Sequence, residues 1–290
     1  MELIKKPQWI RLKVPSGANY TSVKHTLNEL KLHTVCEEAK CPNISECWGM
    51  GTATIMIMGS ICSRGCRFCS VTSGVPGFLD PKEPENVAIA IKKWGLHYVV
   101  ITSVCRDDLE DGGADHIAKT IMMIRSHCPR IIIEALIPDF RGNESAISKV
   151  VSAGPNVISH NIEAVARLSP KVRDSRATYS QSLLVLKKIK NLDPKVYTKS
   201  SLMLGLGEHE HEVLDTMRDL RSIKVSILTI GQYLQPSPRH VPVVRYITPE
   251  MFDWFAQKAK HMGFSYVASG PLVRSSYRAG EFFIRNLASQ

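Results

Sequence analysis

Short apolar runs alternate with amphipathic segments from residue 53 onward, and this alternation constrains the fold more than any other feature of the sequence. The short runs are rich in Val and Ile, which favour strands, whereas the longer segments repeat their apolar positions with a helical period. The predicted strands are 53–58, 98–103, 131–138, 157–162, 198–204 and 227–234. The predicted helices that follow them are 85–94, 115–127, 144–152, 179–190, 208–222 and 249–262.

The order of these elements predicts parallel strands joined by right-handed crossovers. A full barrel of this kind has eight repeats, so six repeats predict an α/β fold with an incomplete (β/α)6 TIM-like barrel over residues 53–262. A flat, doubly wound sheet is the alternative. Residues 1–52 and 263–290 then form N- and C-terminal extensions. In either fold, ligands bind at the carboxyl ends of the strands.

Three cysteines, Cys62, Cys66 and Cys69, directly follow the first predicted strand at the spacing C-x3-C-x2-C. Thiolates are soft ligands that favour zinc, copper(I) or iron–sulfur clusters. A structural zinc site needs four ligands, and no fourth Cys or His stands close by. Three thiols suit a four-iron cluster that keeps one iron open, with a merely structural cysteine cluster as the alternative. Arg64 and Arg67 are expected to place positive charge beside this anionic group.

A second set of three cysteines lies upstream, at the spacing C-x4-C-x5-C. Its members are Cys36, Cys41 and Cys47, and the chain between them is too short for a zinc finger. Each set can hold a cluster, and each lacks one protein ligand.

Composition sets the remaining bounds. With 290 residues, 44% of them hydrophobic, the chain can bury one barrel-sized core. The net charge of +10 fits a nucleic acid partner, an acidic protein partner or an ordinary solvated basic surface, and charge alone does not choose among them. No apolar run approaches the roughly 20 residues of a membrane helix, and the first residues do not resemble a secretory signal. We therefore expect a reducing compartment, the cytoplasm, and no membrane association.

Polar residues gather at the predicted strand ends, where ligands are expected. Thr102 and Ser103 end the second strand, and Asn161 lies in the fourth. Glu134 lies within the apolar third strand, where a carboxylate needs a hydrogen-bonding partner.

The two cysteine sets, together with the sequence Arg-Ser-Ser-Tyr at residues 274–277, resemble the lipoyl synthase family of the radical S-adenosylmethionine superfamily. The resemblance covers nearly the whole chain. It implies two [4Fe–4S] clusters, one on Cys62, Cys66 and Cys69 and an auxiliary one in the extensions. Ser275 is implied as the fourth auxiliary ligand, and the catalytic roles fall to Cys62, Cys66, Cys69 and Ser275. The metal ligands implied are Cys36, Cys41, Cys47, Cys62, Cys66, Cys69 and Ser275.

The resemblance also implies the reaction and the partners. A sulfurtransferase of this family inserts sulfur at C6 and C8 of an octanoyl group that is amide-linked to a lysine of a carrier protein. The carrier is the lipoyl domain of a 2-oxoacid dehydrogenase E2 or the glycine cleavage H protein. The first cluster and S-adenosylmethionine generate the radical, and the auxiliary cluster supplies the sulfur. A reductant such as ferredoxin or flavodoxin and a cluster-repair protein are expected, but no nucleic acid.

Six residues are expected to contact S-adenosylmethionine: Phe68, Thr102, Ser103, Glu134, Asn161 and Arg173. The sequence departs from the family pattern at Cys105, where Asn or Asp is usual, at Glu110 and at Ser201. Two other functions fit the cysteines: a radical enzyme that methylthiolates RNA, and a non-catalytic electron carrier with two clusters.

Overall fold

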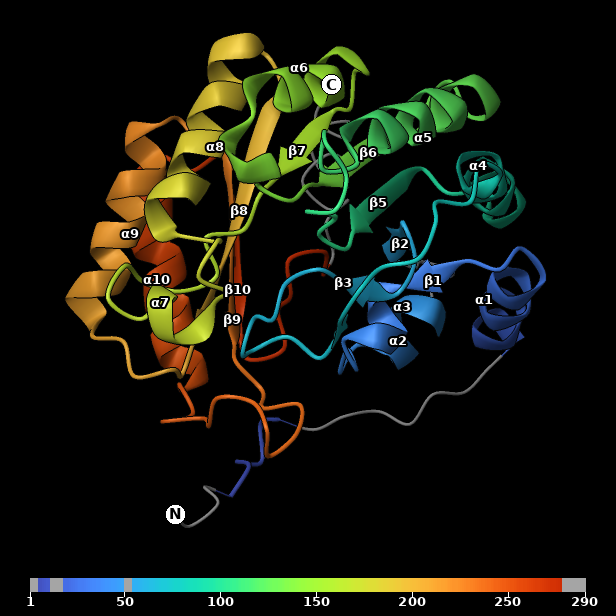
Figure 1. Ribbon diagram of the computed structural model, residues 1–290. Helices are drawn as coiled ribbons and strands as arrows, with labels where there is room; N and C mark the ends of the chain where they lie inside the picture. Colours follow the sequence, from blue (N-terminus) through green and yellow to red (C-terminus); the bar gives the residue numbers. More distant parts are fainter. Residues whose placement is uncertain (1–4, 11–17, 50–53, 278–290) are drawn as a thin grey trace. The chain divides into compact units, whose positions relative to one another are not determined.

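The computed structural model describes residues 5–10, 18–49 and 54–277 (Figure 1). The chain divides into two compact units, which we describe separately. The N-terminal unit comprises residues 13–64, 71–158 and 276–290. The C-terminal unit comprises residues 1–12, 65–70 and 159–275.

The N-terminal unit is built around neighbouring strands in the order β1-β2-β5-β6. Three of them, β2 (Thr54–Ile57), β5 (Tyr98–Ser103) and β6 (Ile132–Leu136), are parallel, and β1 (His33–Thr34) runs antiparallel to β2. Every residue of β2 is buried. Parallel strands that are covered on both faces read as continuous apolar runs, which is why these segments lack polar alternation.

Amphipathic helices cover these strands. α4 (Glu83–Trp94) packs against α5 (Ala114–His127), and α5 packs against α6 (Glu144–Ser152), as Figure 1 shows. Each helix buries one apolar face, and Gly95 ends α4 in the left-handed conformation. β7 (Val157–Ser159) follows α6.

The C-terminal unit repeats the same plan. Its strands β8 (Tyr197–Leu204), β9 (Ile227–Gln232) and β10 (Tyr266–Gly270) are neighbours in that order and parallel. The helices α8 (Tyr179–Leu192), α9 (Glu210–Ser222) and α10 (Pro249–His261) lie along one side of them in Figure 1. One apolar core fills the space between these strands and helices. It includes Leu202, Met217, Ile230, Phe252 and Phe255.

Shorter elements complete the chain. The N-terminal unit also contains α1 (Ala18–Glu29), α2 (Val35–Glu38), α3 (Ile44–Gly49), β3 (Ile61–Cys62), β4 (Thr72–Ser73) and the 3-10 helix η1 (Phe140–Gly142). The C-terminal unit adds α7 (Ser169–Val172). In the described part of the chain, every helix is too short or too polar to cross a membrane.

The predicted α/β class is confirmed, and all six predicted strands exist. Strand order follows chain order in both units, as in a barrel, whereas a doubly wound sheet reverses its order at a switch point. Strand bounds shift by one to three residues, and the main differences from the expectation are at β7 and β10. β7 ends at Ser159 rather than at residue 162, and β10 adds a further parallel strand within the segment that we assigned to the C-terminal extension. The boundaries at residues 52 and 262 remain predictions.

Candidate functional site

The first cysteine loop leaves β2 through a sharp turn. Met58 and Gly59 both have positive φ angles, 68° and 85°. Strand residues have negative φ angles, so the strand ends before this turn. A carboxylate oxygen of Glu83 accepts the Met58 N–H at 2.8 Å and contacts Nε2 of buried His116 at 2.7 Å. Gly113 fits against this turn, because a Cβ there would lie 2.3 Å from the Met58 sulfur. These contacts hold the backbone that leads into the cysteine loop.

The sulfur of Cys62 accepts two backbone N–H groups. Arg64 donates at 3.5 Å and Cys105 donates at 3.4 Å, while the Cys105 carbonyl accepts the N–H of Ser63 at 3.0 Å. The Cys105 side chain and these amides lower the pKa of the Cys62 thiol to about 6. A cysteine must be a thiolate to bind iron, so the surroundings of Cys62 favour the ligating form.

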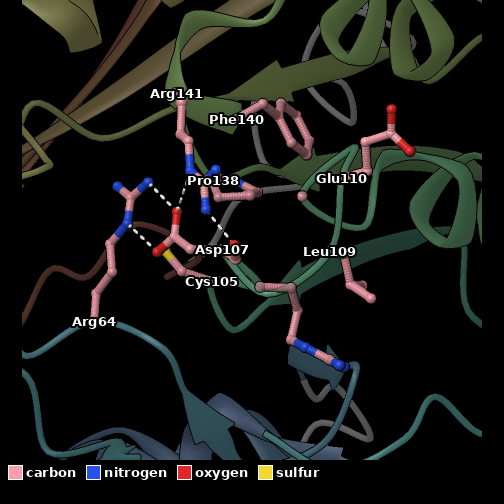
Figure 2. A pocket seen from close by; sticks show the side chains of 10 residues that line it. Arg64, Cys105, Asp107, Leu109, Glu110, Pro138, Phe140 and Arg141 are labelled. Carbon is pink, nitrogen blue, oxygen red and sulfur yellow. Dashed lines mark hydrogen bonds and ion pairs between the residues drawn. The ribbon is translucent and has the colours of Figure 1, made fainter. Parts of the chain in front are cut away.

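Arg64 is the centre of a buried ion network. Its guanidinium forms paired hydrogen bonds with Asp107, both at 2.8 Å, and with Asp139, both at 2.7 Å. Ser63 donates to Asp107 at 2.8 Å, and Arg141 approaches the same carboxylate (Figure 2). Arg64 lowers the pKa of Asp107 far below its usual range. Two carboxylates offset the Arg64 charge and fix the loop, and the same guanidinium contributes to lowering the pKa of the Cys62 thiol. The expectation that Arg64 places positive charge beside a cluster stays a prediction.

These side chains border a pocket that opens to solvent. Arg64, Asp107 and Arg141 line it together with Cys105 and Phe140 (Figure 2). The pocket lies where the loops after β5 and β6 meet, which is the edge of the sheet that a barrel uses for ligands.

The other two cysteines of the loop belong to the C-terminal unit. The Asp174 N–H donates to the Cys66 sulfur at 3.3 Å, and the Asp174 carboxylate accepts the Gly65 N–H at 2.8 Å. Nε2 of His240 lies 2.9 Å from the Cys69 carbonyl oxygen. The loop is therefore tied to the segments after α7 and β9.

The two residues between Cys66 and Cys69 are also fixed. The Arg67 backbone donates to Val172 at 2.9 Å and accepts from Val241 at 3.0 Å, and its exposed side chain donates to the Lys171 carbonyl. Phe68 packs against the core of the C-terminal unit.

The donor set fits iron–sulfur clusters. All eight cysteines lie within the described ranges, and none forms a disulfide. Among the same residues, no three Cys, His, Asp or Glu side chains surround a single ion. A four-iron cluster does not require that, because each cysteine binds a different iron. Backbone N–H groups donate to the sulfurs of Cys62 and Cys66. Hydrogen bonds of this kind tune the potential of a cluster when such sulfurs bind one.

The predicted cofactor contacts of the N-terminal unit lie at strand ends or within a strand. Thr102 is buried, and the Ser103 hydroxyl is buried without a hydrogen-bond partner among the residues that the structure covers. Glu134 is 1% exposed and accepts a hydrogen bond from the hydroxyl of Tyr98. Burial, with Glu134 nearby, raises the pKa of Tyr98 well above its usual range. The expectation that Glu134 needs a partner is confirmed.

Two residues of the C-terminal unit that were predicted to contact S-adenosylmethionine also have a buried polar atom without a hydrogen-bond partner in the described residues. Asn161 donates to Glu163 at 3.0 Å, yet its carbonyl oxygen is buried and has no partner in the described segments. Arg173 is 8% exposed and donates to Ser182 at 2.7 Å, while its Nε is buried and likewise unpartnered there. Burial raises the pKa of Glu163.

The second cysteine set lies on short helices of the N-terminal unit. Cys36 is buried at the start of α2, Cys47 lies in α3, and Cys41 lies in the connection between these helices. Burial raises the pKa of the Cys36 thiol to about 11. A bound metal ion would have to displace that proton.

Ser275 is the last residue of the C-terminal unit. The segment before it passes very close to β9, since a Cβ on Gly231 would lie 2.1 Å from the Val273 carbonyl oxygen. The next two residues contact the N-terminal unit, to which they belong. Ser276 accepts a hydrogen bond from Thr54.

Four acidic residues hold the first loop, and none of them was given this role from the sequence, although Asp107 lies in the polar run after the second predicted strand: Glu83, Asp107, Asp139 and Asp174. Asp107 and Asp139 follow two consecutive predicted strands. Their position at the carboxyl edge, opposite a loop with two arginines, is the signal that could have identified them.

Two family models match the chain. The radical SAM superfamily model matches residues 56–220, and a model of the N-terminal domain of lipoyl synthase matches residues 1–41. A mitochondrial lipoyl synthase of Rattus norvegicus is 54% identical over 295 residues, which cover 100% of this chain and 79% of the relative. The corresponding protein of Aedes aegypti is 56% identical over 98% of this chain and 74% of its own length.

Solved structures share the fold at low sequence identity. The hydrogenase maturase HydG of Carboxydothermus hydrogenoformans aligns with a TM-score of 0.57 at 13% identity, over 92% of this chain and 78% of its own. SuiB of Streptococcus suis, bound to S-adenosylmethionine, aligns with a TM-score of 0.59 at 8% identity, over 78% of this chain and 53% of its own. With these matches, the cysteine loop and the partial barrel, the chain belongs to the lipoyl synthase family of radical S-adenosylmethionine sulfurtransferases, whose cofactors are [4Fe–4S] clusters and S-adenosylmethionine.

Proposed function

We propose that this protein inserts two sulfur atoms, at C6 and C8, into an octanoyl group that is amide-linked to a lysine of a carrier protein. The observation that carries the proposal is the pair of cysteine sets, each with three thiols, combined with the terminal segment that contacts the second set's helix. Saturated C–H bonds are not acidic, so no side-chain base can activate them, and the radical chemistry belongs to the cofactors.

The first cysteine loop is proposed to hold the cluster that reacts with S-adenosylmethionine. When bound, this cluster and S-adenosylmethionine supply a radical that can remove hydrogen from an unactivated carbon. Cys62, Cys66 and Cys69 would be the ligands. The Arg64 network fixes the loop on one side of Cys62, and the backbone N–H groups of Arg64, Cys105 and Asp174 stabilise negative charge on the sulfurs.

The proposed S-adenosylmethionine contacts differ in how well they are supported. Ser103, Asn161 and Arg173 each have a buried polar atom without a partner in the described residues, and such an atom is costly unless a ligand satisfies it. Glu134 already accepts the Tyr98 hydroxyl, so it is the weaker candidate. Phe68 would contribute through packing. Thr102 is buried beside Ser103.

Ser275 is proposed as the fourth ligand of the auxiliary cluster, with Cys36, Cys41 and Cys47 as the others. This cluster, carried by residues 1–52 and 263–290, would be the sulfur source. Support comes from Tyr277, which contacts Glu46, the residue next to Cys47. A serine oxygen is a harder ligand than a thiolate, and this difference favours Ser275 as the ligand that is released.

The proposed partners follow from the reaction. A lipoyl domain or H protein would present the octanoyl-lysine, and an acidic carrier would match the net charge of +10. A ferredoxin or flavodoxin would supply electrons, and a repair protein would rebuild the auxiliary cluster. The cytoplasm is the proposed compartment, although the rat and mosquito relatives are named mitochondrial.

Anaerobic turnover tests the proposal. The reconstituted enzyme, S-adenosylmethionine, a reductant and an octanoyl-lysine peptide should yield 5′-deoxyadenosine and a peptide that gains two sulfur atoms by mass spectrometry. A parallel reaction offers RNA in place of the peptide. If 5′-deoxyadenosine forms while the peptide stays unmodified and the RNA gains sulfur, the octanoyl-lysine substrate is rejected. A protein that forms no 5′-deoxyadenosine would be a two-cluster electron carrier instead.

A further inference from the structure

The terminal segment is attached to the N-terminal unit at two points that do not involve Ser275. The Thr54 hydroxyl donates to the Ser276 hydroxyl at 2.9 Å, and the Tyr277 hydroxyl donates to the Glu46 carboxylate at 3.0 Å. These contacts join residues that are 222 and 231 positions apart in the chain. Both are bonds between protein groups, so neither depends on a metal–ligand bond.

Both attachment points lie on well-packed elements. Thr54 begins β2, is 7% exposed and pairs with Val100 of β5. Glu46 lies in α3, which packs against α1. Trp48 of the same helix is fully buried, and its ring lies 4.9 Å from that of Tyr20. The segment is therefore fastened to parts of the fold that packing holds in place.

Covalent geometry limits how far Ser275 can move while these bonds exist. Ser275 is one residue from Ser276, which contacts Thr54, and two residues from Tyr277, which contacts Glu46. Because consecutive Cα atoms are about 3.8 Å apart, the Ser275 backbone stays close to both contacts. Glu46 is itself the neighbour of Cys47. A tether of this length gives a detached group a high effective concentration at its former position.

We propose that Glu46 and Thr54 are positioning residues that form a latch for Ser276 and Tyr277, keeping Ser275 beside the second cysteine set when its bond to iron is broken. The latch rests on the proposed role of Ser275 as a ligand. Its purpose would be to let one ligand leave during sulfur transfer without release of the whole terminal segment. The terminal segment would then still be in place when the second sulfur transfer begins.

The test removes the two hydroxyls and keeps the shapes. The double variant Thr54→Val with Tyr277→Phe, reconstituted anaerobically, is compared with wild type by hydrogen–deuterium exchange of the amides at residues 274–277. We expect exchange at least fivefold faster and an increased share of singly thiolated peptide during turnover. The matched control is Thr216→Val with Tyr179→Phe, which removes two hydroxyl hydrogen bonds of the C-terminal unit and should change neither.

Two further variants make the result decisive. Tyr277→Phe alone should give an intermediate increase in exchange, and it replaces the double variant if that protein has lost its cooperative thermal transition. Wild-type exchange at residues 274–277 in a folded variant overturns the latch. Ser275→Ala separates the two proposals: normal sulfur insertion in this variant rejects Ser275 as a ligand, while the exchange result still decides the latch.

Discussion

The two cysteine sets have the same number of thiols, but the fold holds them by different means. The first follows β2 and is fastened by buried charge: Arg64 between Asp107 and Asp139, with backbone amides on Cys62 and Cys66. The second lies on short helices, and its proposed fourth ligand arrives from a segment more than 200 residues away, fastened by hydroxyl hydrogen bonds. The first arrangement agrees with the proposal of a cluster that persists, and the second agrees with the proposal of a ligand set from which Ser275 is released.

Removing the first set tests this comparison with the largest expected effect. The anaerobically reconstituted protein should bind two four-iron clusters, which is roughly eight irons per chain. Cys62→Ala, Cys66→Ala and Cys69→Ala together should halve that number and abolish 5′-deoxyadenosine formation. Cys128→Ala is the control and should retain both. An iron assay that finds only four irons in fully reconstituted wild type would refute the presence of two clusters.

Removing Ser275, the proposed ligand of the terminal segment, should affect only the cluster on the second cysteine set. Ser275→Ala should still form 5′-deoxyadenosine, because that step requires the first cluster alone, but should fail to insert sulfur. Ser276→Ala loses only the contact with Thr54 and should retain more lipoyl product. Iron and sulfide counts on both variants separate lost assembly from lost reactivity. A wild-type yield from Ser275→Ala would contradict the assignment.

The buried charges around the first set should matter for folding. Asp139 is 1% exposed, so Asp139→Ala leaves part of the Arg64 charge unpaired and should lower the free energy of unfolding by about 3–5 kcal/mol. Asp215→Ala breaks an exposed pair with Arg218 and should cost less than about 1 kcal/mol. Chemical denaturation of both variants measures the difference. Equal losses would show that the network is not what holds this loop.

The same network has a pH dependence of known sign. Arg64 lowers the pKa of Asp107 in the folded state. The ionised Asp107 carboxylate therefore contributes its full stabilisation above the pKa of an Asp in the unfolded chain, about 3.9. That contribution is lost as the pH falls through the folded pKa. Wild type should therefore lose more stability between pH 5 and 3 than Asp107→Asn does. Parallel losses in urea titrations would assign the acid sensitivity to other carboxylates.

Salt should have the smallest effect and should not distinguish the two sets. Raising ionic strength should weaken turnover of an intact acidic carrier, because screening reduces long-range attraction to a chain of net charge +10. An uncharged octanoyl-lysine peptide should be much less affected. Steady-state rates with both substrates measure this, and equal sensitivity would show that the positive net charge does not attract the carrier.

Local pattern was enough to predict most elements of this protein. The strands β2, β5, β6, β8 and β9 were predicted because a covered parallel strand needs a continuous apolar run, and no distant residue changes that requirement. The spacing of Cys62, Cys66 and Cys69 likewise depends only on neighbouring residues, since it determines which ligands one loop can offer. β10 was placed in the C-terminal extension because the barrel was predicted to end with the helix at 249–262.

The sequence by itself thus determined the parallel α/β fold and both cysteine sets, and through the family resemblance it led to the proposal that Ser275 is a ligand. Only the tertiary structure decided what fastens them. Arg64 pairs with Asp107 and Asp139 across 43 and 75 residues, and Tyr277 reaches Glu46 across 231. Such partners leave no local periodicity, because a buried charge or hydroxyl requires a partner in space and not at any fixed distance along the chain.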